Sequence, residues 1–231
     1  MVPFKVTFRF AAPVLRDSEQ PIHLDALIAY AAMKDHEEIG AENPWREADD
    51  LSGYLDKTPG KQWVWKASMV MFAPVSARQW VNQIRRADPE RYYNDLGKYW
   101  VGRGKQNVLG INPETFKIDT RSGRQRGYQW LTAVQWMDAA TAWGVGDIDA
   151  VRYALEEHIT HIGKKGVNGY GRIASVEVIA APADEADNWM LRVLPESANG
   201  KPGIQYEPVL ATLRAPYWRK LNRVMALEPV V

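Results

Sequence analysis

The first residues of the chain alternate between hydrophobic and polar side chains. Every second residue from Phe4 to Phe10 is hydrophobic, and Lys5, Thr7 and Arg9 lie between them. This period of two is typical of a β-strand with one buried face. Residues 23–34 then place hydrophobic side chains at helical spacing among good helix formers, which predicts the first helix.

The next hundred residues have a less regular pattern. Residues 37–60 are rich in Gly, Pro, Asp and Asn, which predicts a long surface connection. Aromatic and β-branched side chains in residues 62–72 predict a second strand. Residues 74–127 are more polar and basic, and within them we expect a helix over residues 77–86 and a hairpin turn at residues 121–124. We interpret this region as an insertion.

Three further elements follow the insertion. Residues 129–137 are hydrophobic on both alternating faces, as in a strand that is buried on both sides. Asp147 is placed to cap a helix whose hydrophobic residues recur at spacings of three and four up to Ile162. A glycine-rich loop ends this helix, and residues 173–181 favour a strand. We also expect a strand over residues 189–194.

The order of these elements predicts an α+β fold. The order β-α-β-β-α-β is the ferredoxin-like arrangement, a four-stranded antiparallel sheet backed by two helices, which is also the RNA-recognition (RRM-like) fold. We expect one domain over residues 1–181, with the insertion at about residues 74–127. Residues 182–231 would form a C-terminal extension packed on the same domain.

Composition narrows the class of protein. The chain has 231 residues, of which 46% are hydrophobic, enough for a substantial core. It has no cysteine, which excludes disulfides, thiolate metal sites and cysteine nucleophiles. No apolar run approaches the roughly 20 residues of a membrane helix, so we expect a cytoplasmic protein without a membrane partner. The net charge is only +1, but basic residues gather in residues 98–126, 164–172 and 214–223, which suggests one basic face.

The glycine-rich loop is the first candidate site. Residues 163–172 hold four glycines and three cations. Glycine permits a positive φ and lets backbone N–H groups approach an anion, so we favour phosphate binding over a plain helix-to-strand connection. The loop is not a P-loop, because no Gly-Lys-Ser/Thr follows the spacer. The candidate RNA-binding residues here are Lys164, Lys165, Gly166, Asn168, Gly169, Tyr170, Gly171 and Arg172.

The basic insertion is the second candidate site. Its candidate RNA contacts are Arg103, Lys105, Arg121, Arg124 and Arg126. Cationic side chains of this kind bind nucleic-acid phosphates, and each contact adds to the salt dependence of binding. The octapeptide typical of RNA-recognition domains is absent from residues 130–137, so backbone and loop contacts would carry the binding.

The four histidines raise the question of catalysis, because their ordinary pKa suits proton transfer near neutral pH. His158 and His161 are one helical turn apart, but no third ligand accompanies them, so we expect helix-surface residues, no metal and no cofactor. His23 either caps the first helix or faces RNA. A metal-independent ribonuclease would have to use His23, Tyr170 and Lys164, and no residue is assigned as catalytic.

Two motifs resemble a known family. Residues 21–27 read Pro-Ile-His-Leu-Asp-Ala-Leu, and residues 169–173 read Gly-Tyr-Gly-Arg-Ile. They are similar to the start of the first helix and to the glycine-rich loop of repeat-associated mysterious proteins (RAMPs) of CRISPR systems, in particular the type IV subunit that binds the 5′ handle. Residues 214–218 resemble a late segment of the same group.

This resemblance implies a non-catalytic subunit that grips the repeat-derived 5′ handle of CRISPR RNA and caps a filament of backbone subunits, with the inserted hairpin as a thumb. Its partners would be CRISPR RNA, the repeated backbone subunit, the large subunit and, in some type IV systems, a DinG-type helicase, with target DNA reached through the complex. Two alternatives stay open. One is a metal-independent endoribonuclease that processes CRISPR RNA on the same fold, and the other is a ferredoxin-like small-molecule or protein-interaction module.

Overall fold

The computed structural model of the protein describes residues 1–15, 21–85, 127–217 and 222–230. The chain divides into two compact units, one formed by residues 1–79 and 134–231 and the other by residues 80–133. Within the described residues, the second unit contains most of β4 (Gln79–Arg85) and most of β5 (Tyr128–Gln135), two neighbouring strands. The hairpin turn expected at residues 121–124 lies outside the described residues.

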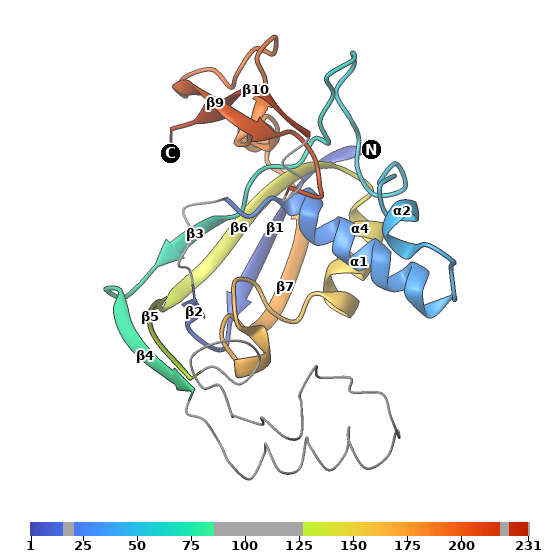
Figure 1. Ribbon diagram of the computed structural model, residues 1–231. Helices are drawn as coiled ribbons and strands as arrows, with labels where there is room; N and C mark the ends of the chain where they lie inside the picture. Colours follow the sequence, from blue (N-terminus) through green and yellow to red (C-terminus); the bar gives the residue numbers. More distant parts are fainter. Residues whose placement is uncertain (16–20, 86–126, 218–221, 231) are drawn as a thin grey trace, which may run out of the picture. The chain divides into compact units, whose positions relative to one another are not determined.

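The first unit is built on a four-stranded antiparallel sheet (Figure 1). Its central strand β1 (Val2–Phe10) pairs with β6 (Met137–Gly146) on one side and with β7 (Ile173–Ala180) on the other. The fourth strand, β3 (Met71–Pro74), pairs with β6, so the order is β3-β6-β1-β7. The alternating side chains of β1 account for its place, because Phe4, Val6 and Phe8 are completely buried. The strands expected around residues 4–10 and over residues 173–181 are confirmed as β1 and β7.

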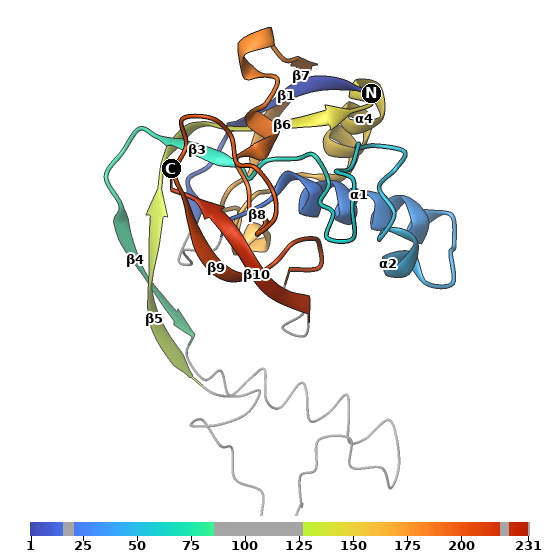
Figure 2. The same cartoon turned by 90° about the horizontal axis from the view of Figure 1, so that it is seen from above.

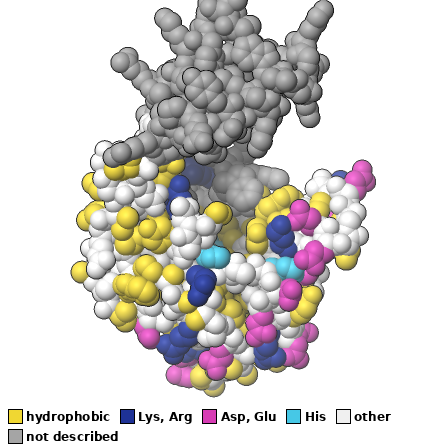
Figure 3. Space-filling model, turned by 90° about the horizontal axis from the view of Figure 1, so that it is seen from below, with side chains coloured by type: hydrophobic (Ala, Val, Ile, Leu, Met, Phe, Trp, Pro, Cys, Tyr) yellow, Lys and Arg dark blue, Asp and Glu magenta, His cyan; other side chains and the backbone are white. Residues whose placement is uncertain are grey.

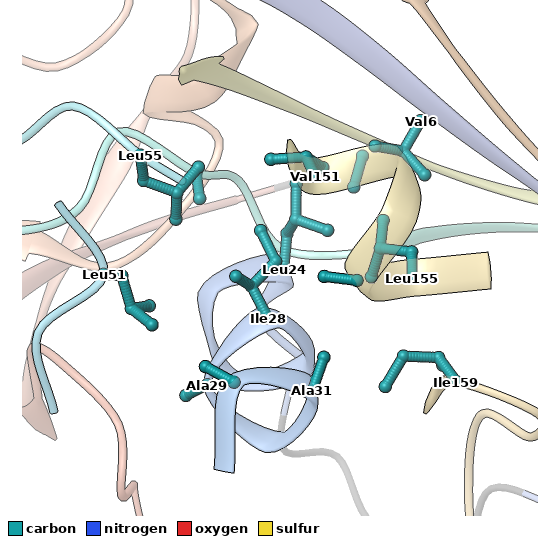
Figure 4. Packing of buried hydrophobic residues seen from close by; sticks show 14 of the residues in the cluster. Val6, Leu24, Ile28, Ala29, Ala31, Leu51, Leu55, Val151, Leu155 and Ile159 are labelled. Atoms are coloured by element: carbon teal, nitrogen blue, oxygen red, sulfur yellow. The ribbon is translucent and has the colours of Figure 1, made fainter. Parts of the chain in front are cut away.

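Two helices enclose the main core together with the sheet. Leu24 and Ile28 of α1 (Leu24–Glu38) lie close to Val151 and Leu155 of α4 (Ile148–His158), as Figure 4 shows. The Asp147 carboxylate accepts hydrogen bonds from the backbone N–H groups of Asp149 and Ala150, which confirms the predicted cap.

The helix α4 ends earlier than its hydrophobic pattern suggested. Ile159 has an extended backbone, and the N–H of Ile162 donates to the carbonyl of Gly171 instead of continuing the helix. Both isoleucines are still buried. The periodicity therefore marked burial correctly but did not mark the end of the helix.

The strand expected over residues 129–137 is in fact two strands. Trp136 separates β5 from β6, and β6 is the strand that lies in the main sheet. Its small residues Ala140, Ala142 and Gly144 stand directly opposite Phe8, Val6 and Phe4 of β1. A Cβ atom on Gly144 would lie 2.4 Å from the Phe4 ring, so the low β-propensity of this strand is the consequence of close packing against large neighbours.

Two other predicted elements are wrong. The helix expected over residues 77–86 is wrong, because the described residues there contain the strand β4, in agreement with the β-propensity of Trp80, Val81 and Ile84. The segment at residues 189–194 begins with the 3₁₀ helix η5 (Asn188–Met190), and only β8 (Leu194–Pro195) follows as a strand. Of the strand expected over residues 62–72, only its end forms part of a regular strand, β3.

The C-terminal residues form a second antiparallel sheet. Its strands are β8, β10 (Arg223–Pro229) and β9 (Tyr206–Thr212), with β10 in the middle (Figure 2). Its buried side chains Leu194 and Ala226 pack with Trp189 of η5 and with Val64 in a second hydrophobic cluster. The remaining short elements are β2 (Val14–Leu15), α2 (Pro44–Glu47), η3 (Gly166–Asn168) and η4 (Ala183–Glu185). The predicted α+β class with antiparallel sheets is confirmed.

Candidate functional site

A cleft of about 850 Å³ opens between α1 and the segment that follows α4. Ala26 and Leu27 of α1 line one wall, and Ile159, Lys164 and Gly166 line the other. Figure 3 shows one face of the protein on which histidine side chains lie near Lys or Arg side chains and hydrophobic side chains. A cleft of this size, mostly apolar and with a few polar groups, is the usual form of a ligand site.

The glycine-rich loop has a fixed and unusual conformation. Lys165 adopts a positive φ of 61°, as do Gly169 and Gly171 with φ of 87° and 63°. The N–H of Gly171 donates to the carbonyl of Pro13, and the N–H of Lys164 donates to the carbonyl of Leu15. These bonds attach the loop to the segment that contains β2.

Several loop amides are already used inside the chain. The N–H groups of Lys164, Asn168, Gly169 and Gly171 all donate to backbone carbonyls of the chain itself. They are therefore not the anion-binding amides that the glycine spacing suggested. The side chains of Lys164 and Arg172 are exposed, so side-chain charge is what this loop offers a phosphate.

Gly171 should be the least replaceable glycine of the loop. A Cβ atom there would lie 1.9 Å from the carbonyl oxygen of Ile162, whereas a Cβ atom on Gly169 would meet nothing within 4 Å. Both positions share the strain of a positive φ, about 1–2 kcal/mol for alanine. We expect Gly171→Ala to lower the free energy of unfolding by about 1–3 kcal/mol more than Gly169→Ala does, the usual cost of steric overlap. Urea denaturation measures the difference, and equal losses would contradict the close packing.

The structure brings some of the candidate residues together. His23, Lys164 and Gly166 line the same cleft, although His23 is more than 140 positions away in the chain. The other loop candidates lie in the same loop but not in the lining of the cleft; they are Lys165, Asn168, Gly169, Tyr170, Gly171 and Arg172. The candidates of the insertion lie outside the described residues; they are Arg103, Lys105, Arg121, Arg124 and Arg126.

His23 is a buried wall residue. It is only 3% exposed, and its ring stacks on that of Tyr217 with centroids 4.5 Å apart. It occupies the N-cap position of α1, but its side chain makes no capping hydrogen bond, so the capping alternative is wrong. Burial, with a smaller effect of the nearby Arg192 guanidinium, holds the pKa of the imidazole well below its ordinary value. The ring is therefore neutral at pH 7.

A buried charged network lies behind His23. Arg192 and Asp25 are both completely buried, with 3.4 Å between the guanidinium and the carboxylate. The Tyr217 hydroxyl donates to Asp25 at 2.8 Å and accepts from Arg192 at 2.9 Å. Arg192 also donates to the carbonyls of Trp65, Ala67 and Leu213. Burial raises the pKa of the Asp25 carboxyl, while Arg192 and Tyr217 act to lower it.

Burial of neutral His23 should make the protein less stable in acid. The unfolded chain binds a proton at the ordinary histidine pKa near 6.5, but the folded chain does not. The stability is therefore complete above about pH 6.5 and falls by up to about 1.4 kcal/mol per pH unit below it. We expect His23→Phe, which keeps an aromatic ring against Tyr217, to remove this part of the slope between pH 7 and pH 5. Asp25 is present in both proteins, so its opposite contribution cancels; identical slopes would contradict the prediction.

The other two histidines near the cleft are not residues of an open helix surface. His158 is the last residue of α4, its side chain is 5% exposed, and its Nε2 lies 2.7 Å from Asp35 Oδ1. His161 comes after the helix, with its Nδ1 2.8 Å from the Thr160 hydroxyl. The expectation of two helix-surface histidines is therefore wrong. The part of the chain that the structure describes contains no group of three or more His, Asp or Glu side chains arranged to hold a metal ion.

Sequence reasoning missed the two tyrosines of the cleft. Tyr30 is 41% exposed in its lining, and Tyr217 stacks on His23 there. Tyr30 lies four positions after Ala26 and seven after His23, so helical spacing alone could have placed it on this face. Nothing in the pattern around Tyr217 connects it with His23.

A second cavity of about 470 Å³ lies beside the first, and Asp49, Ala215 and Pro216 line both. Lys61 and Arg214 line the second cavity, and the Arg214 guanidinium lies 3.9 Å from the centre of the Trp63 ring. Cationic side chains are thus present in both cavities.

The fold and site define an α+β protein with antiparallel sheets and a preformed cleft bordered by a cationic loop. The family model described as CRISPR type IV associated protein Csf3 matches residues 2–229, and the chain belongs to this family. It is therefore a component of a type IV CRISPR effector, which is a multi-subunit complex. No curated protein matches the chain. Among the described residues, none of the helices has the length and apolar character to cross a membrane.

Proposed function

We propose that this protein is a non-catalytic, cytoplasmic subunit that binds the repeat-derived 5′ handle of CRISPR RNA and caps the backbone filament of the type IV effector. The observation that carries the proposal is the glycine-rich loop. Hydrogen bonds to Pro13 and Leu15 fix its backbone, and it presents Lys164 and Arg172 beside a ligand-sized cleft. A preorganised cationic loop binds phosphate at a low entropic cost.

The arrangement of the main sheet supports the finer family assignment. The strand order β3-β6-β1-β7, with α1 after β1 and α4 after β6, is the order of a ferredoxin-like core. We assign this core to the RAMP type, with residues 1–181 as the domain, an insertion at about residues 74–127 that serves as a thumb, and residues 182–231 as an extension. The partners would be the repeated backbone subunit, the large subunit and, in some systems, a DinG-type helicase, and target DNA would be met through the complex.

The test is to express the protein together with the other effector subunits and sequence the RNA that copurifies. We expect short RNAs with a common repeat-derived 5′ end, and we expect Lys164→Ala, Lys165→Ala and Arg172→Ala together to lose them. A triple variant at Lys34, Lys57 and Arg223 removes the same charge outside the loop and both cavities, and should keep the RNA. A folded wild-type complex that carries no such RNA would refute the proposal.

A processing endoribonuclease is a second candidate, because the cleft combines His23, His161 and Lys164 with two tyrosines. Metal-independent cleavage needs a general base and a cation near the 2′-hydroxyl, and these are residue types that can supply them. Cleavage of repeat RNA in EDTA that is lost in both His23→Ala and His161→Ala would establish this function in place of the first.

A further inference from the structure

We propose that the cleft between α1 and the glycine-rich loop holds one nucleotide of the bound RNA, with its base between the apolar walls and its phosphate at Lys164. This inference rests on the proposed function and adds to it a defined subsite. Its volume of about 850 Å³ falls within the roughly 300–1,000 Å³ of small-ligand pockets, so an unstacked nucleotide fits.

The walls suit the flat, apolar faces of a base. Ala26 of α1 and Ile159 after α4 line the cleft from different elements. The small side chain of Ala26 leaves room that a larger residue would fill. Tyr30 remains 41% exposed in the lining and offers an aromatic surface. RNA-binding proteins commonly stack splayed-out bases on such side chains.

His23 supplies an unsatisfied polar group. Its Nδ1 is buried and has no hydrogen-bond partner in the described part of the structure. Buried polar atoms without partners are rare and costly, and because His23 lines the cleft, a ligand bound there is the partner that we infer for this atom. A neutral imidazole can donate or accept, and the edge of a base offers both kinds of partner.

The charged side chains that line the cleft determine the orientation of the nucleotide within it. Lys164 lies in the loop after α4, whereas Asp49 lies in the segment after α2. Lys164 attracts a phosphate and Asp49 repels it, so the phosphate belongs on the side of the glycine-rich loop.

The histidines provide a direct probe. Of the four histidines in the chain, His23, His158 and His161 line the cleft, and His36 does not. We would titrate the protein with each of the four nucleoside 5′-monophosphates and follow the imidazole proton signals by NMR, with inorganic phosphate as the comparison. Nucleotides should shift the His23 and His161 signals while His36 stays unchanged. Shifts as large with phosphate alone, or none with any nucleotide, would overturn a base-binding cleft.

A cavity-filling variant tests the cleft on RNA itself. Handle RNAs that each lack one base should reveal a position whose loss weakens wild-type binding about tenfold, a size typical of one stacked base. Ala26→Phe should lose about as much with intact RNA and become insensitive to that missing base. Ala174→Phe, at an exposed position of β7 outside the cleft, is the matched control.

A second variant covers the case in which Ala26→Phe does not fold. Tyr30→Ala removes an exposed ring of the lining and should show the same insensitivity, whereas Tyr153→Ala on α4 should not. If wild type binds RNA but no missing base is coupled to these variants, this inference fails and the proposed function stands. If free nucleotides shift the histidine signals without such coupling, the ligand is a free nucleotide and the inference fails too. If wild type binds no RNA, the proposed function fails.

Discussion

Replacement of Arg192 by methionine is expected to lower the free energy of unfolding by about 3–5 kcal/mol, the usual effect of breaking a buried ion pair. Methionine replaces the aliphatic part of the arginine side chain, but without the guanidinium the Asp25 carboxylate is buried without its cation. It also removes the donors that reach the carbonyls of Trp65, Ala67 and Leu213. Urea denaturation of both proteins at pH 7 gives the difference directly.

An exposed pair provides the control for this prediction. Arg9 and Asp138 form a 2.9 Å ion pair whose side chains are 54% and 61% exposed. Arg9→Met should therefore cost less than about 1 kcal/mol. The double variant Asp25→Asn with Arg192→Met should be less destabilised than the sum of its single variants, because neither charge is then left alone. A loss for Arg192→Met no larger than that for Arg9→Met would show that the buried network does not stabilise the fold.

Removal of the loop cations should flatten the salt dependence of RNA binding. Each phosphate contact on a single strand contributes about 0.7 to the slope of log affinity against log salt. The combined variant Lys164→Ala, Lys165→Ala and Arg172→Ala should therefore lower the slope by about two units. Its deficit relative to wild type should be greatest at low salt. Fluorescence anisotropy of a labelled handle RNA between 50 and 200 mM salt measures both slopes.

The triple variant at Lys34, Lys57 and Arg223 separates local contacts from general charge. It has the same net charge as the loop variant, so long-range attraction falls equally in both proteins. An equal change of slope in the two variants would mean that the loop makes no special contacts with phosphate. A change confined to the loop variant would assign these contacts to the glycine-rich loop.

The elements that could be predicted best from the sequence are those in which the hydrophobic pattern shows which face is buried. The alternation around Phe4, Val6 and Phe8 and the spacing after Asp147 each describe one buried face, and both elements are present, although α4 ends at His158 before its hydrophobic pattern does. β6 was missed because Ala140, Ala142 and Gly144 carry little signal of their own. Their size makes sense only beside the larger residues of β1, more than a hundred positions away.

The candidate site also depends on contacts between residues far apart in the chain, which a local sequence pattern does not reveal. The glycine-rich loop was found because its composition is unusual, yet the use of its amides by the chain itself follows from contacts with Pro13 and other carbonyls that no pattern encodes. Lys164 and His23 were proposed separately, and only folding places them in one cleft. The pairing of Asp25 with Arg192 joins residues 167 positions apart and leaves no periodic trace.

The position of Tyr217 in the chain bears on how the protein is made. During synthesis α1 leaves the ribosome nearly two hundred residues before Tyr217, which donates to Asp25 and lines the cleft. Until that tyrosine emerges, Asp25 lacks one of its partners and the cleft lacks part of its wall. A nascent chain should therefore be unable to capture its ligand early, and assembly would begin with a protein whose translation has already passed Tyr217.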